Sequence, residues 1–344
     1  MLQVQNIIQH KAQYAAALGK RNIKNAAELL DEVIALDEER KKTQQRLDST
    51  LAEANVLAKQ IGGLMKEGKK EEAETVKTKT ADLKKVSKEL GEALTSIQAS
   101  LQKALYDLPN IPHDSVPMGN SDEDNEEVER VGELPQLSKD AKPHWELIKQ
   151  YDIIDFDLGI KITGAGFPVY KGKGARLQRA LVNFFLDEAM NAGYAEVQPP
   201  IVVNEASGYA TGQLPDKEGQ MYHAQADNLY LIPTAEVPIT NLYRDVILKE
   251  EELPIKHVGF TPCFRREAGS WGAHVRGLNR LHQFDKVEIV QVRKAEDSYQ
   301  ALEDMCQHVA GLLQKLELPY RKLRLCGGDL GFTSALTFDF EVFS

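Results

Sequence analysis

Cysteine is scarce in this chain, with single residues at positions 263, 306 and 326 and no Cys-x-x-Cys pair. An odd, widely spaced set fits neither a disulfide framework nor a structural zinc site, so we expect no protein-bound metal and favour a reducing, cytoplasmic location. Long apolar runs are also missing, since no stretch approaches the roughly 18 residues that cross a membrane. The first twenty residues hold no apolar block of the kind found in secretory signals. We therefore expect no membrane partner.

Positive charge is not in excess, with 42 Lys and Arg against 52 Asp and Glu and a formal net charge of −10. This balance excludes a uniformly basic nucleic-acid coat, and we expect no DNA partner, although a local basic patch can still exist. At about 100 to 200 residues per domain, 344 residues favour two or more domains. The chain divides by composition into residues 1–107, 108–143 and 144–344.

Proline is absent before Pro109, and residues 1–107 are dense in Ala, Leu, Glu, Lys and Gln, which favours helix. A heptad seam steps by three and four residues from Ala73 to Ala104, and a less regular seam runs from Val33 to Ile61 with one slip near Leu47. The glycines at 62, 63 and 68 can reverse the chain between them. The pattern predicts an antiparallel two-helix hairpin over about residues 26–105. The seam positions of its second helix are Ala73, Val76, Thr80, Leu83, Ser87, Leu90, Leu94, Ile97, Leu101 and Ala104.

The tip of this hairpin is locally basic, with eight lysines and five acids between Lys66 and Lys88. Charge alone does not decide between a solvated helix pair and a binding surface. The next segment, 108–143, is rich in proline and carries a net charge of −5 over residues 121–130, which is typical of an acidic linker.

From residue 144 onward the periodicity is mixed and predicts an α+β domain. A helical pattern follows residue 172, and extended segments are expected at 195–203, 229–232, 256–264, 281–292 and 338–343. Because no regular crossover helices separate these segments, an antiparallel sheet is favoured over a doubly wound one. Prolines 199 and 200 place the first segment at a sheet edge or an interface.

Residues 264–289 are typical of two strands joined by a glycine-bearing loop, and they contain Arg265, Arg266, Arg276 and Arg280. Guanidinium groups suit planar, bidentate recognition of phosphate or carboxylate, so an anionic ligand is indicated. By the period of two, Phe284, Lys286 and Glu288 share one face of the returning strand, while Asp285 and Val287 share the other. When these residues are considered one by one, the alternative is a surface hairpin stabilised by ion pairs.

The order Phe-Arg-Arg-Glu-Ala-Gly, Arg-Gly-Leu and His-Gln-Phe-Asp-Lys-Val-Glu resembles motif 2 of the class II aminoacyl-tRNA synthetases in its seryl form. Gln198-Pro199-Pro200 resembles motif 1, Pro233-Thr234-Ala235-Glu236 is similar to a serine-binding signature, and the hairpin has its expected place. The chain thus resembles the seryl-tRNA synthetase family over essentially its whole length. The resemblance implies an N-terminal antiparallel coiled-coil arm, then a class II antiparallel β-sheet catalytic domain flanked by helices, and a homodimer through the region near Pro199 and Pro200.

The resemblance also implies a serine–tRNA ligase, which forms seryl-adenylate from ATP and L-serine and transfers the seryl group to the 3′ end of tRNA(Ser). Arg265 would be catalytic through contact with the α-phosphate, Glu267 would contact the adenine amino group, Arg280 the γ-phosphate, and Phe284 would stack on adenine. Magnesium ions (Mg2+) would accompany ATP. The implied ATP-binding set is Arg265, Arg266, Glu267, Arg276, Arg280, Leu281 and Phe284; the serine-binding set is Thr234, Ala235, Glu236, Arg265 and Glu288; and Lys69, Lys70, Lys77 and Lys79 would hold the long variable arm of the tRNA.

The sequence departs from the family in two ways. It stops at Ser344, before the place of motif 3 and its arginine, so we expect a partial sequence of a complete enzyme and a chain that is nearly inactive by itself. His274 and Val275 replace a more familiar Asp-Thr, and Trp271 is bulky for its loop. A non-catalytic binding paralogue, or an inactive fragment, is the alternative. A relative that aminoacylates carrier proteins should lack the long hairpin, which argues against that reading.

Overall fold

A computed structural model describes residues 2–217, 219–267 and 276–343. The chain forms two compact units, of which the first is Met1–Glu126 with Arg324–Thr337 and the second is Glu127–Leu323 with Phe338–Ser344. The boundary therefore crosses the segment 108–143 that was expected to be a linker. Part of that segment belongs to the first unit, and its β1 strand (Glu126–Val131) belongs to a sheet.

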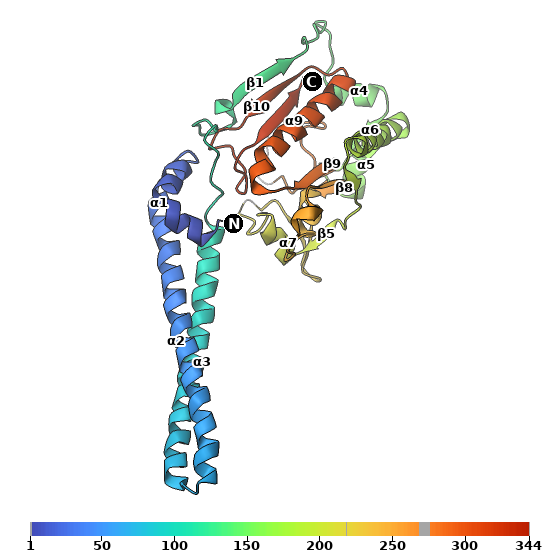
Figure 1. Ribbon diagram of the computed structural model, residues 1–344. Helices are drawn as coiled ribbons and strands as arrows, with labels where there is room; N and C mark the ends of the chain where they lie inside the picture. Colours follow the sequence, from blue (N-terminus) through green and yellow to red (C-terminus); the bar gives the residue numbers. More distant parts are fainter. Residues whose placement is uncertain (1, 218, 268–275, 344) are drawn as a thin grey trace. The chain divides into compact units, whose positions relative to one another are not determined.

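The first unit is built on the helices α1 (Val4–Gly19), α2 (Ala26–Lys66) and α3 (Lys70–Tyr106). Helices α2 and α3 run side by side in opposite directions (Figure 1). All ten seam positions predicted for α3, from Ala73 to Ala104, are buried or half-buried. The heptad pattern thus identified the packed face of α3 correctly.

The seam predicted for α2 was wrong at Leu51 and Ala58, whereas Ala54 is buried and Ile61 half-buried as expected. Leu51 is 44% exposed, and Ala58 is exposed as well, while Thr50 and Leu57 lie half-buried instead. With Thr50 and Leu57 in place of those two residues, the α2 seam from Val33 to Ile61 steps by three and four residues without a slip. Asp37 lies next to a seam position, Leu36, and is only 4% exposed. Its carboxylate lies 2.8 Å from Arg40 Nη2 and 2.7 Å from Lys41 Nζ, so these two cations compensate a buried charge that an apolar pattern passes over.

The reversal between the two helices depends on one of the three glycines. Gly62 and Gly63 lie inside α2, whereas Gly68 lies after its end with a φ of +77°. A left-handed backbone favours glycine, which has no Cβ atom to clash there. Gly68 therefore makes the turn, and the other two glycines are ordinary helical residues.

The base of the arm packs α1 against the ends of α2 and α3 through Ile7, Leu18, Leu30, Leu101 and Leu105. Directly after α1, the guanidinium of Arg21 donates hydrogen bonds to four backbone carbonyls, at 2.8 to 3.3 Å. Burial lowers the pKa of Arg21, but a guanidinium stays charged at neutral pH. The four acceptors are Asn110, Leu330, Gly331 and Ser334, so this one side chain joins the segment after α3 to residues 330–334 of the same unit.

The second unit contains the sheet β4–β8–β9, formed by β4 (Ala195–Glu196), β8 (Ile255–Phe264) and β9 (Gln283–Val292). Strands β8 and β9 are antiparallel, as expected, but β4 pairs with β8 in parallel. The predicted antiparallel pairing is confirmed for β8 and β9, and the edge strand β4 departs from it. Helix α6 (Gly172–Asn191) contributes Ala189 to a small core with Val258 of β8 and the nearby Tyr194.

The proline-interrupted segment 195–203 supplies strands to two different sheets, namely β4 and β5 (Val202–Asn204). Strand β5 pairs with β7 (Leu229–Leu231), which pairs in turn with β6 (Tyr222–Ala224). Two prolines separate the strands because they cannot donate ladder hydrogen bonds.

The other elements are β2 (Ile154–Asp155), β3 (Val169–Tyr170), β10 (Tyr320–Arg324), β11 (Phe338–Val342), α4 (His144–Gln150), α5 (Phe156–Ile162), α7 (Glu205–Ala210), α8 (Glu236–Asn241), α9 (Ser298–Lys315) and 3-10 turns at Asp122–Asp124, Glu250–Glu252 and Ala295–Asp297. Within the described ranges, no helix is both long and apolar enough to span a bilayer.

Candidate active site

One face of the β8–β9 pair carries the predicted ligand-binding residues. Phe284, Lys286 and Glu288 lie opposite Cys263, Thr261 and Gly259 in the antiparallel register. Cys263 and Thr261 are 0% and 1% exposed, so they form the floor of this face. Burial raises the pKa of the Cys263 thiol, which is therefore a neutral part of that floor. The period-of-two assignment of Phe284, Lys286 and Glu288 to one face is confirmed.

Four of the five predicted serine-binding residues meet at the Glu288 end of this face, and the fifth, Arg265, lies over Phe284 at the other end. The Thr234 hydroxyl donates to Glu288 Oε2 at 2.8 Å and accepts from the backbone N–H of Glu236 at 3.2 Å. Thr234 and Ala235 are 4% and 0% exposed. Glu236 is exposed to solvent as a residue, but its carboxyl group is surrounded by many protein atoms. Desolvation, and secondly the charge of Glu288, raise the pKa of Glu236, while the charge of Lys286 opposes this shift. The structure thus brings together Thr234, Ala235, Glu236 and Glu288.

Lys286 is a site residue that the sequence reasoning did not assign. Its Nζ atom lies 2.5 Å from Glu288 Oε2 and 2.9 Å from Thr234 Oγ1. The signal was present in the sequence, because Lys286 stands between Phe284 and Glu288 on the same face. Its role there could not be assigned without Thr234, which comes from 52 residues earlier in the chain.

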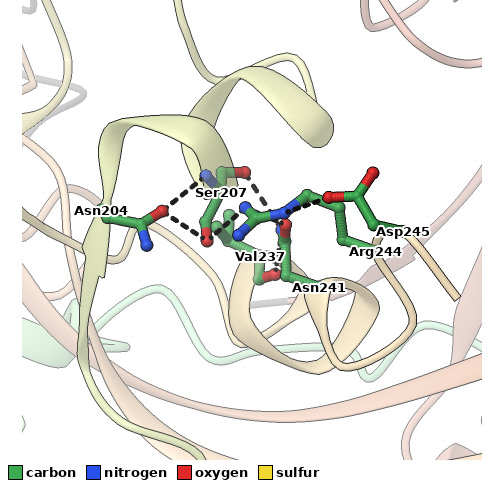
Figure 2. A network of polar contacts seen from close by, with 6 residues as sticks. All are labelled: Asn204, Ser207, Val237, Asn241, Arg244 and Asp245. Atoms are coloured by element: carbon green, nitrogen blue, oxygen red, sulfur yellow. Dashed lines mark hydrogen bonds and ion pairs between the residues drawn. The ribbon is translucent and has the colours of Figure 1, made fainter.

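A hydrogen-bond network supports the element that carries Glu236. Figure 2 shows Arg244 reaching from beyond α8 to the Ser207 hydroxyl of α7 at 3.0 Å and to the Asn241 side-chain oxygen at 2.9 Å. Asn204 begins α7 by accepting from the Ser207 N–H and hydroxyl, each at 3.0 Å. Asn241 also donates to the Val237 carbonyl at 2.8 Å. The network holds α8 against α7 and so fixes the start of α8, where Glu236 lies.

The predicted ATP-binding residues form two pairs at the other end of the face. Arg265 extends the strand pairing by donating its backbone N–H to the His282 carbonyl at 3.0 Å, and its Cζ atom lies 5.2 Å from the Phe284 ring centroid. Arg280 Nη1 lies 3.1 Å from Glu267 Oε2. Glu267, three residues after the end of β8 at Phe264, has a φ of +48°.

The remaining ATP-binding candidates are less closely joined to these pairs. Leu281 is 8% exposed, the backbone N–H of Arg266 donates to the Gln220 carbonyl at 2.9 Å, and the Arg276 guanidinium lies 5.3 Å from the Trp145 ring centroid. The departures noted at Trp271, His274 and Val275 lie outside the described residues.

His282, directly before β9, has a structural role beside the site. Its ring stacks on Phe167 at 5.4 Å, its Nδ1 atom lies 2.6 Å from the Tyr222 hydroxyl, and its N–H donates to the Gly166 carbonyl. Gly166, at φ +83°, allows this approach, since a Cβ atom there would lie 2.3 Å from the His282 ring. In the part of the chain that the structure describes, no group of three or more His, Cys, Asp or Glu could hold a metal ion.

The lysines predicted to bind tRNA lie at the arm tip and are largely exposed. Lys69, Lys77 and Lys79 pair with Glu67, Glu74 and Glu53 at 2.9, 3.3 and 2.9 Å, and Lys70 begins α3. Exposed ion pairs of this kind contribute about 0 to 1 kcal/mol, so they can exchange for contacts with a phosphate at little cost.

The proline segment expected at a dimer interface lies beside β8. Gly259 permits this contact, because a Cβ atom on it would lie 2.9 Å from the Val197 carbonyl oxygen. The following residues, Pro200, Ile201 and Val202, are exposed.

Comparison with known proteins gives a consistent family. Residues 1–112 match the seryl-tRNA synthetase N-terminal domain, and residues 220–344 match the class II tRNA synthetase core domain (G, H, P, S and T). The chain is 47% identical to the serine–tRNA ligase of Salinibacter ruber over 317 residues, which are 92% of this chain and 74% of that protein. It is 44% identical to that of Akkermansia muciniphila over 100% of this chain and 80% of the relative.

A solved structure agrees with these sequences. The seryl-tRNA synthetase of Pyrococcus horikoshii, complexed with ATP, is similar with a TM-score of 0.89 at 30% identity, over 99% of this chain and 80% of that one. The N-terminal coiled-coil arm and the class II core therefore have counterparts in one known fold. The chain belongs to the seryl-tRNA synthetase family, whose members are class II aminoacyl-tRNA synthetases that act as serine–tRNA ligases.

Proposed function

We propose that this chain binds ATP and L-serine on the face of β8 and β9 that carries Phe284, Lys286 and Glu288. The two substrates would form seryl-adenylate there before transfer to the 3′ end of tRNA(Ser). The main support is that Thr234 donates to Glu288 at one end of this face while Arg265 lies over Phe284 at the other. Phe284 and Glu288 are four residues apart, or about 13 Å along a strand, which suits a ligand with an ammonium at one end and a flat base at the other.

The adenylate half would use the pairs at the Phe284 end. Adenine stacks on the Phe284 ring, Glu267 accepts from the adenine amino group, and Arg265 meets the α-phosphate, where charge grows as pyrophosphate leaves. A fixed guanidinium aimed at that charge contributes about 3 to 4 kcal/mol to such a transition state. Arg280 would contact the γ-phosphate, and Arg276 a phosphate or the acceptor end of the tRNA, while Arg266 and Leu281 line the ATP site.

Magnesium would bind together with ATP, as a complex with its phosphates, rather than at a permanent protein site. Among the described residues no cluster of carboxylates and imidazoles fits a metal, so we assign it no protein ligand. When bound, it neutralises phosphate charge.

The serine half would use Thr234, Ala235, Glu236 and Glu288. Ammonium and hydroxyl groups of serine are both donors, and the two carboxylates with the Thr234 oxygen are acceptors. Rejection of alanine follows because an analogue without the hydroxyl leaves a buried polar group unpaired. Arg265 would reach the serine carboxylate.

Recognition of tRNA would use the arm, with Lys69, Lys70, Lys77 and Lys79 on phosphates of the long variable arm. Two copies would meet through the region near Pro199 and Pro200, whose neighbours Ile201 and Val202 are 38% and 39% exposed. We propose a cytoplasmic location, because the cysteines at 263, 306 and 326 are free thiols.

The test is calorimetric titration of the chain with 5′-O-(N-L-seryl)sulfamoyladenosine, a stable analogue of seryl-adenylate. We expect saturable binding, weaker binding of the alanyl analogue, and a loss of about tenfold or more in the Arg265→Ala variant. Arg293→Ala, near the far end of β9, is the matched control and should leave the affinity unchanged. Absence of binding to the unaltered chain would overturn the proposal.

A non-catalytic paralogue would give a different result. It would bind the analogue yet show no serine-dependent ATP–pyrophosphate exchange, even in a form extended to the length of the curated relatives. Exchange by that extended form supports the ligase.

A further inference from the structure

The hydroxyl of Thr234 has all its hydrogen-bonding capacity in use. It accepts from Lys286 Nζ at 2.9 Å and from the Glu236 N–H at 3.2 Å. Both partners can only donate, so the hydroxyl proton must point to Glu288 Oε2, 2.8 Å away. Lys286 thereby fixes the direction in which Thr234 donates.

Lys286 presents an ammonium group to the acceptors that the proposed function gives to the ammonium of serine. Its Nζ atom contacts Glu288 Oε2 at 2.5 Å and Thr234 Oγ1 at 2.9 Å. An –NH3+ group of the substrate has the same charge and the same three donors. The Thr234 oxygen already accepts two hydrogen bonds, so the ammonium of serine can donate to it only after Lys286 leaves.

The charges around the pocket favour exchange of one cation for another. Glu288 and Glu236 are two carboxylates, and Lys286 is the cation that faces them; the charge of Lys286 counteracts the upward shift that Glu288 causes in the Glu236 pKa. Thr234, Thr261 and Cys263, from the neighbouring elements, are uncharged beside them. The Lys286 side chain is 35% exposed, against 18% for Glu288, so the lysine can move toward solvent while the acid stays in place.

If Lys286 leaves Glu288, its ammonium group can reach the anionic link of the bound adenylate. On the strand it stands two residues from Phe284 and two from Glu288, or about 7 Å from each. The proposed ligand places its base at Phe284 and its ammonium at Glu288. The acyl-phosphate link of the adenylate then lies between them, beside Lys286.

We propose that Lys286 is a displaceable counter-ion of the amino-acid pocket. Without substrate it holds Glu288 and Thr234 in place; when serine binds, the serine ammonium displaces it from both, and Lys286 then contacts the acyl-phosphate group of the adenylate. This inference rests on the proposed function. It makes Lys286 a positioning residue for the pocket and a contact of the adenylate.

The experiment compares two probes on the unaltered chain and on Lys286→Met. Serinol carries the ammonium and hydroxyl of serine without a carboxylate, and 5′-O-(N-L-seryl)sulfamoyladenosine adds the anionic link and the base. Removal of the competing cation should tighten serinol binding about fivefold. Loss of the contact with the anionic link should weaken binding of the analogue about tenfold. Lys286→Arg keeps the charge and should not tighten serinol binding.

Tighter binding of serinol together with weaker binding of the adenylate analogue in Lys286→Met supports the exchange. Weaker binding of both probes in Lys286→Met would show a purely structural lysine, and unchanged binding of both would show a bystander; either result overturns the proposal. If the unaltered chain binds no adenylate analogue, the proposed function fails instead.

A measurement on the unaltered chain covers the case in which Lys286→Met does not fold. The 15N resonance of Lys286 Nζ, assigned with Lys286→Arg, should shift when serinol is added, because the contact with Glu288 is lost. A resonance that does not move at saturating serinol overturns the exchange.

Discussion

The Cζ atom of Arg265 lies 5.2 Å from the centroid of the Phe284 ring. The guanidinium thus covers one face of the ring on which adenine is proposed to stack. The pair Arg280 and Glu267, at 3.1 Å, and the contact of Lys286 with Glu288 are similar, since each joins two groups that the proposed function or the further inference assigns to a ligand. Binding at this face therefore exchanges internal contacts for ligand contacts, and the net affinity is the difference between them.

Phe284→Ala should weaken binding of the adenylate analogue about tenfold or more, because base–aromatic stacking contributes about 1 to 3 kcal/mol per base. Calorimetry with the analogue measures this. Phe260→Leu is the matched control, because Phe260 lies opposite Val287 on the other face of the strand pair. An affinity reduced equally by both variants would contradict the assignment of adenine to Phe284.

Thr234→Val should lower affinity for the seryl analogue about 5- to 100-fold, since the substitution removes the hydroxyl that donates to Glu288 and accepts from donors in the pocket. It should also reduce the preference for the seryl over the alanyl analogue, measured as the ratio of the two dissociation constants. Thr234→Ser retains the hydroxyl and should restore most of the preference. A preference that survives in Thr234→Val places the discrimination elsewhere.

The double variant Lys69→Ala with Lys70→Ala should bind tRNA(Ser) more weakly and with a flatter dependence on salt. Each phosphate contact that is lost removes about 0.9 from the slope of log affinity against log salt concentration. Filter binding at several salt concentrations measures the slope. Lys42→Ala with Lys103→Ala removes the same charge from parts of the arm away from its tip and should leave the slope nearly unchanged; equal effects of the two double variants would refute a specific role for the tip.

Asp37→Asn should destabilise the arm at neutral pH by about 1 to 3 kcal/mol. Burial of Asp37 opposes its ionisation, but hydrogen bonds from Lys41 and Arg40 outweigh that effect and lower its pKa. An acid whose pKa is lower in the folded state stabilises that state above its unfolded pKa of about 3.9, and this contribution is lost as pH falls through the folded pKa. Urea unfolding followed by circular dichroism should therefore show a difference between variant and parent at pH 7 that narrows progressively as the pH falls below about 4. A difference that does not vary with pH would mean that the charge of Asp37 contributes nothing.

The sequence by itself determined the elements that depend on local periodicity. A heptad pattern marks a packed face directly, so the α3 seam from Ala73 to Ala104 was predictable residue by residue. Strand alternation in β9 placed Phe284 and Glu288 on one face for the same reason. The family followed from motifs that are contiguous in the chain, such as Phe264 to Gly269.

Only the tertiary structure decided the contacts between distant segments. Asp37 can be buried in α2 because Arg40 and Lys41 satisfy its charge, which apolar periodicity does not register. Strand β4 is parallel to β8 because the chain crosses through α7 and α8 before it returns. The contact of Lys286 with Thr234 depends on a strand and a helix start 52 residues apart, and hydrogen bonding across that separation follows from packing rather than from local pattern.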